Sequence, residues 1–197
     1  RARRTRYTPV NSTATAHRRD SFAGLVLFVL VMLAAPTSAL AHGADSDGVA
    51  GNYRSEIIDA GVDGLIWNVR GGDDLIELTN DPGSVVIVFG YRGEPYLRFV
   101  PGDGVYRNAA SPATYLNDDR FGDVTMPAEV SFGAPADAAA EWESVADANS
   151  YSWHDHRAHW MSRTDPPAVV ADRNSEHLIL EYEIPLQVAG SPVAATG

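Results

Sequence analysis

The chain has 197 residues, with no cysteine, no lysine and a formal net charge of −11. After residue 41 it holds nine arginines and 25 acidic residues, a net charge of −16, which argues against binding to nucleic acid or to anionic lipid surfaces. Without cysteine, an exported domain has no disulfide, and a metal site has to use His, carboxylate, Met or the N-terminal amine.

Residues 1–41 have the pattern of a secretory signal peptide. Six arginines precede an apolar stretch at 25–35, and a small–x–small cleavage pattern follows at 39–41. The apolar stretch is short for a membrane span, and an uncleaved anchor at 22–41 is the alternative. Cleavage predicts a protein exported to the extracellular space or the cell envelope, with His42 as its first residue.

The exported part is expected to contain one domain. Its length is ample for a single hydrophobic core. Residues 42–55 are small and polar and predict a flexible lead-in, and residues 189–197 predict a polar tail. The domain is therefore expected to span residues 56–188.

Segments with strand periodicity follow one another through this domain. Apolar and polar side chains alternate over 65–70, and an apolar run at 85–89 predicts a central strand buried on both faces. Further strands are expected at 75–79, 96–100, 105–106, 151–156 and 177–184, one helical turn at 136–142, and a long loop region at 108–137. The pattern predicts an all-β fold, an immunoglobulin-like β-sandwich with a long loop region, preceded by the signal peptide.

Three histidines lie within the nine residues 153–161. Imidazole is the commonest transition-metal ligand in proteins. In a strand at 151–156, His154 and His156 would share one face about 7 Å apart. The mature N-terminal amine and ring of His42 could chelate Cu(II), and Asp155 would orient one imidazole. The predicted copper ligands are His154, His156, His159 and His42.

The same run of residues has a second interpretation without a metal. Asp155 and Arg157 could form an ion pair, and the imidazoles could bond backbone carbonyls at a strand end. Arg157 would also place a permanent positive charge near any bound cation. Under this interpretation the run is a structural network or a surface for a protein partner.

Two other polar groups of residues were considered as sites. The acidic loop at 117–123 supplies oxygens suited to Ca²⁺ but lacks the EF-hand spacing, and a solvated Asx-rich turn is the alternative. Glu94 lies between Arg92 and Arg98, which predicts an ion pair or a small network rather than a catalytic acid. The sequence contains none of the common hydrolase, phosphate-binding or dinucleotide motifs, so no catalytic residue is proposed.

Four unusual motifs, at 90–98, 111–117, 119–122 and 153–161, together resemble an uncharacterised group of exported actinobacterial envelope proteins. The similarity covers about residues 41–190. It implies an envelope location, a last strand and a C-terminal membrane helix beyond Gly197, but no activity.

A looser similarity is to copper-carrier β-sandwiches of the CopC type, which also mature to an N-terminal His. The stretch 143–153 resembles the approach to one of their late strands, and Tyr151 would be a tyrosine corner. At 154–156, however, this chain has His-Asp-His where those proteins have Asp-Gly-His.

The leading hypothesis is a non-enzymatic, exported β-sandwich of the cell envelope that binds copper through the histidine cluster. The alternative is a structural or protein-interaction module of the envelope without a metal. A copper-dependent enzyme is the third hypothesis.

Overall fold

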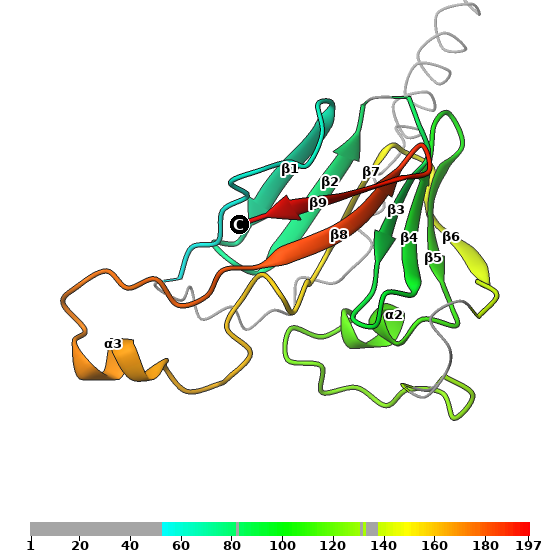
Figure 1. Ribbon diagram of the computed structural model, residues 1–197. Coiled ribbons are helices and arrows are strands. Elements are labelled where there is room, and N and C mark those ends of the chain that lie inside the picture. The colour runs from blue at the N-terminus through cyan, green and yellow to red at the C-terminus, as the bar shows by residue number, and fades with distance from the viewer. Residues whose placement is uncertain (1–52, 82, 131, 133–137) are drawn as a thin grey trace, which may run out of the picture. The chain divides into compact units, whose positions relative to one another are not determined.

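The computed structural model describes residues 53–197, apart from residues 82, 131 and 133–137. The predicted signal peptide, His42 and most of the predicted lead-in lie outside these described residues. Nine strands and two short helices are present in the described part of the chain. The strands form two antiparallel sheets, which confirms the predicted all-β sandwich (Figure 1).

The smaller sheet has three strands, in the order β1-β2-β7. Its strands are β1 (Leu65–Arg70), β2 (Leu75–Asn80) and β7 (Ser150–Trp153). The larger sheet has six strands, in the order β6-β5-β4-β3-β8-β9. They are β3 (Val86–Phe89), β4 (Pro95–Val100), β5 (Gly104–Asn108), β6 (Trp142–Ala146), β8 (Glu183–Val188) and β9 (Ser191–Thr196).

One hydrophobic core joins the two sheets. Leu78 and Trp153 from the smaller sheet belong to the same buried cluster as Val88, Phe99 and Ile184 from the larger sheet. The alternation of β2, in which Ile76, Leu78 and Asn80 are buried, shows why period-two patterning located these strands correctly. The core therefore holds the sandwich together without any disulfide.

β3 lies in the middle of the larger sheet, between β4 and β8, as predicted. The prediction that it is buried on both faces is wrong. Val86 and Val88 are buried, whereas Ile87 and Phe89 are only partly buried. The apolar run correctly indicated a central position in the sheet. One face of this sheet packs on the core and the other meets solvent, so only alternate residues of β3 are buried.

The C-terminal part differs from the expectation at two places. The predicted strand at 177–184 is instead β8 at 183–188, and the predicted polar tail contains β9. β8 and β9 form a hairpin whose turn residues, Ala189 and Gly190, both have positive φ. A strand needs a hydrogen-bonded neighbour. The segment that contains β8 pairs with β9 from Glu183 onward, with one more backbone pair between Tyr182 and Gly197.

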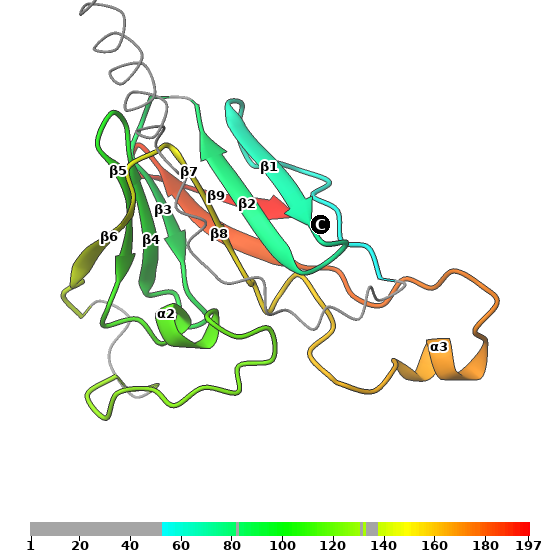
Figure 2. The ribbon, with the colours of Figure 1, turned by 180° about the vertical axis from the view of Figure 1, so that it is seen from behind.

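The loop region at 108–137 begins with a short helix, α2 (Pro112–Leu116), which Ser111 caps by accepting from the Ala113 amide at 3.2 Å. The predicted helical turn at 136–142 is wrong where the structure describes it, because residues 138–141 are not helical and Trp142 begins β6. A second helix, α3 (Pro167–Ala171), lies on an excursion between β7 and β8 that extends away from the sheets (Figures 1 and 2). Neither helix is long enough to cross a membrane, and the described residues contain no other helix.

A substitution at Gly104 tests the close approach of β5 to β6 in the larger sheet. Its φ is +136°, and a Cβ at this position would lie 2.3 Å from the backbone oxygen of Ala146 on β6. We expect Gly104→Ala to lower the free energy of unfolding by about 3 kcal/mol, because backbone strain and a clash act together. Gly102→Ala is the matched control: its φ is +71° with open space around it, so a loss of about 1 kcal/mol is expected. Urea denaturation followed by circular dichroism measures both, and equal losses would contradict the clash.

Candidate functional site

The four motifs that carry the resemblance meet at one end of the sandwich. The Tyr91 hydroxyl donates to the Asn117 side chain and accepts from the His156 amide at 3.0 Å. The Tyr91 ring also stacks on the His156 ring, with centroids 5.7 Å apart. His156 in turn bonds the backbone oxygen of Asp119. Motifs far apart in sequence therefore form one connected network.

Asp155 is the centre of this network. Its side chain is fully buried and accepts hydrogen bonds from Trp153 Nε1 at 2.9 Å and from Arg157 Nε and Nη2, both at 2.7 Å. Burial alone would raise the pKa of Asp155, but the Arg157 guanidinium and these donors outweigh it and hold that pKa below its usual value. The predicted pairing of Asp155 with Arg157 is confirmed. The predicted role of Asp155 in orienting an imidazole is wrong, because Trp153 and Arg157 occupy both its oxygens.

Each of the three imidazoles is bonded to a different backbone carbonyl. His154 Nδ1 lies 2.9 Å from the Asp74 oxygen, His156 Nε2 lies 2.9 Å from the Asp119 oxygen, and His159 Nδ1 lies 3.3 Å from the Trp160 oxygen. A carbonyl can only accept, so each of these nitrogens carries the hydrogen. In the neutral rings the lone pairs then lie on His154 Nε2, His156 Nδ1 and His159 Nε2.

Two of the imidazoles are held in the neutral form. Burial is the main cause that lowers the pKa of His156 and lowers the pKa of His159 to about 4. The Arg120 guanidinium lowers the pKa of His159 further. The His159 side chain is only 3% exposed, and its Nε2 has no hydrogen-bond partner among the described residues. A buried polar atom without a partner is uncommon in folded proteins.

The strand pair predicted for His154 and His156 does not form. β7 ends at Trp153, so the alternation of a strand does not apply beyond it. The chain turns there instead: the backbone amide of Ala158 donates to the backbone oxygen of Asp155 at 2.8 Å. His154 bonds to the β1–β2 turn, while His156 faces Tyr91 and the acidic loop.

His156 and His159 are the histidine pair that the structure places together. Their ring centroids are 5.6 Å apart, with the ring planes at 80° in an edge-to-face arrangement. An ion about 2 Å from one nitrogen of each ring would lie about 3.2 Å from each centroid, so this separation permits a shared ion. The orientation requires one ring to rotate first. Within the described part of the chain, no three His or carboxylate side chains are grouped to hold a metal ion.

The acidic loop is ordered by its own backbone. Asp119 Oδ1 accepts from the Phe121 amide at 2.8 Å and from the Asp123 amide at 3.0 Å, and the Asp123 amide is the main cause that lowers the pKa of Asp119. These are the contacts of the predicted Asx-rich turn. Arg120 leaves the loop and pairs with Asp73 at 2.8 Å and with Asp74 at 3.1 Å, which ties the loop to the β1–β2 turn.

Of the two arrangements predicted for Glu94, the described residues show a small network and no ion pair. Its buried carboxylate accepts from the Ser111 hydroxyl at 2.8 Å and from the backbone amide of Arg92 at 2.9 Å. The Arg98 guanidinium instead lies 4.5 Å from the ring centroid of Trp142. Glu94 thus joins β4 to the start of α2 as a structural acceptor.

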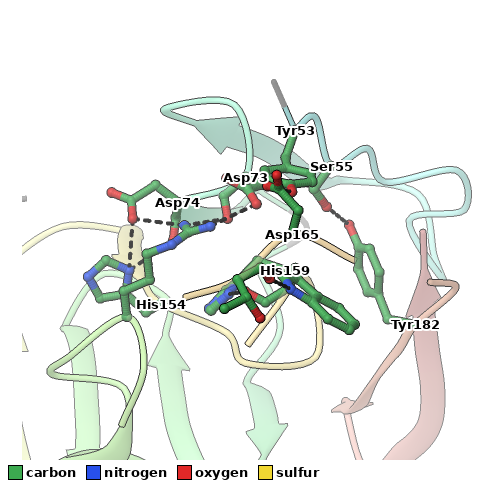
Figure 3. A network of polar contacts seen from close by, with 11 residues as sticks. Tyr53, Ser55, Asp73, Asp74, His154, His159, Asp165 and Tyr182 are labelled. Atoms are coloured by element: carbon green, nitrogen blue, oxygen red, sulfur yellow. Dashed lines mark hydrogen bonds and ion pairs between the residues drawn. The ribbon is translucent and has the colours of Figure 1, made fainter. Parts of the chain in front are cut away.

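A pocket of about 630 Å³ lies beside this network, and sequence patterns did not reveal it. Its walls come from residues 53–58, 158–160 and 173–182, with Asp73, Asp165, Val169 and Gly197. Tyr53 donates to Asp165 at 2.9 Å, and Ser55 lies 2.7 Å from the Tyr182 hydroxyl (Figure 3). Tyr53 and Ser55 lie at the end of the predicted lead-in, and both make side-chain contacts in the structure. No local motif marks these residues, because the contacts join positions more than 100 apart in sequence.

Comparisons with protein-family models, with curated proteins and with solved structures found no match to this chain. The contacts around Asp155 and the pocket beside His159 are therefore the basis for assigning a function.

Proposed function

We propose that this protein is an exported, non-enzymatic interaction module of the cell envelope. In this proposal the residues 153–161 form a structural network and the neighbouring pocket is the binding surface. One observation carries it: the fully buried Asp155 engages Trp153 and Arg157 with both oxygens. Each imidazole also bonds its own backbone carbonyl, which supports a structural role for the run.

Export rests on residues 1–41. The arginine-rich start, the apolar stretch and the cleavage pattern support a signal peptide. The high acidic content after residue 41 supports a domain that stays soluble next to anionic surfaces. Expression of the full chain in an actinobacterial host, with N-terminal sequencing of the envelope and culture fractions, is expected to give a product that begins at His42. A product that retains residues 1–41 in the cytoplasm would contradict export.

Copper binding is the second candidate function. The observation that favours it is the neutral pair His156 and His159, whose ring separation permits a shared ion. The unpartnered Nε2 of His159 would be one ligand, and the amine and ring of His42 would complete a tetragonal nitrogen site. Under this candidate His154 is not a ligand, because its ring lies against the β1–β2 turn and not with the pair of His156 and His159.

Titration of the exported protein with Cu(II), followed by electron paramagnetic resonance, separates the two candidates. The interaction-module proposal expects weak binding, with no site of sub-micromolar affinity and an unchanged melting temperature after chelation. A tight nitrogen-coordinated site that His156→Ala abolishes would overturn that proposal and establish the copper candidate. His154→Ala is the matched control, since it lies in the same run and removes an imidazole outside the pair.

A further inference from the structure

The pocket beside His159 presents aromatic ring faces. Three aromatic side chains line it, and each has its polar atom engaged elsewhere: Tyr53 with Asp165 at 2.9 Å, Trp160 with the Thr164 oxygen at 2.7 Å, and Tyr182 with the Glu56 oxygen at 2.9 Å. Their hydroxyl and indole N–H groups are therefore used inside the protein. A ligand in the pocket can contact mainly the rings of these side chains, and the π electrons of aromatic rings attract cations.

The charges around the pocket also favour a cation. Four carboxylates line it, from Glu56, Asp73, Asp165 and Glu176, against two guanidinium groups. Both guanidinium groups are paired with lining acids, Arg54 with Glu56 at 2.5 Å and Arg173 with Asp165 at 2.6 Å. Asp73 pairs with Arg120 at 2.8 Å, which leaves Glu176 as the carboxylate in excess. An acidic excess in a partly enclosed pocket raises the local concentration of cations and repels anions.

Two further features of the pocket bear on the ligand. His159 lines the pocket, but its Nε2 is buried and does not face a ligand. Ile58 and Leu178 border the pocket with 81% and 80% of their side chains exposed. Large aliphatic side chains on the border of a pocket suit a ligand with an apolar body.

We propose that this pocket binds an organic ammonium ion with an apolar body. The aromatic side chains and carboxylates hold the charged head, and Ile58 and Leu178 cover the body. This inference rests on the proposed function, because it names the ligand class of the interaction module. A volume of about 630 Å³ is in the range of small-molecule sites.

Three probes of similar shape test the proposal: 2-phenylethylammonium, 2-phenylethanol and 3-phenylpropionate. Calorimetric titration of the full chain is expected to show the cation binding about tenfold more tightly than the alcohol, with the anion weakest. The cation is expected to weaken as salt is added. Equal affinity for all three probes would overturn the proposal.

A matched pair of variants locates the site. Tyr53→Leu removes a ring from the pocket and is expected to weaken binding of the cation about tenfold. Tyr106→Leu is the control, because this tyrosine also bonds an aspartate, Asp103 at 2.7 Å, but lies on β5 outside the pocket. Amide shift changes on adding the cation should lie at 53–58 and 158–182. Equal affinities in both variants, or shift changes elsewhere, would refute the location.

The outcomes separate this inference from the proposed function. A pocket that binds the neutral alcohol as well as the cation would overturn the ammonium class and leave the interaction module in place. A tight Cu(II) site that excludes 2-phenylethylammonium would overturn both.

Discussion

Asp155→Asn is expected to lower the free energy of unfolding by about 3–5 kcal/mol. The substitution keeps the size of the side chain but removes the charge that pairs with Arg157. That guanidinium is largely buried, and its Nε and Nη2 would lose charge-assisted bonds of 2.7 Å. Asn also has a single acceptor oxygen, so its amide nitrogen would face either Trp153 Nε1 or Arg157 Nε. Urea denaturation at neutral pH, followed by circular dichroism, measures the loss.

The control for this substitution is Asp123→Asn. Asp123 pairs with Arg163 at 2.6 Å, but both side chains are about two thirds exposed. Water screens such a pair, so a loss of at most about 1 kcal/mol is expected. A small loss at Asp155 as well would contradict the structural role of the network, and with it the proposal that residues 153–161 need no metal.

Acidification from pH 7 to about pH 4 is expected to remove about 3 kcal/mol of stability through His159 alone. In the folded protein the pKa of this imidazole is lowered from 6.5 to about 4. The unfolded chain therefore takes up a proton near pH 6.5, where the folded protein does not. The contribution is complete above pH 6.5 and is lost as the pH falls toward 4. His156, whose pKa is also lowered, adds to the loss in the same pH range.

Two measurements check this pH dependence. The Cε1 proton of His159 should titrate in nuclear magnetic resonance spectra with a midpoint near pH 4, and a midpoint near 6.5 would contradict its burial. In denaturation series at several pH values, His159→Asn should flatten the dependence of stability on pH between 6.5 and 4.5.

These two expectations bear on how the site works. If His159 stays neutral, it adds no positive charge to the pocket wall near neutral pH. If the Asp155 network is rigid, the pocket wall at 158–160 keeps its shape whether or not a ligand is bound. The proposed ammonium site depends on both properties.

Strand prediction succeeded where a strand lies on the core with a clear alternation. β1, β2 and β4 have this pattern, and the structure places them within one residue of the predicted bounds. It failed at β7 and β8, where alternation continues beyond the last hydrogen-bonded neighbour. The periodicity of side chains indicates which face of a segment is apolar. It does not indicate where hydrogen bonding to the neighbouring strand ends.

The candidate site was predicted in part. The run 153–161 stood out because histidine is rare and three lay together, and the pairing of Asp155 with Arg157 followed from charge and proximity in sequence. The pairing of His156 with His159 could not be foreseen, because it depends on a turn that Asp155 stabilises. The pocket residues Tyr53 and Tyr182 carry no local signal at all.

The amino-acid sequence by itself determined the class of fold and the place where unusual chemistry is concentrated. Both follow from local properties: periodicity of apolar side chains, turn residues, and a cluster of titratable groups within nine positions. Only the tertiary structure decided how the histidines of 153–161 are used and where the pocket lies. Those depend on which carbonyl, ring or carboxylate from a distant segment reaches each side chain, and that pairing is set by the packing of the two sheets rather than by neighbours along the chain.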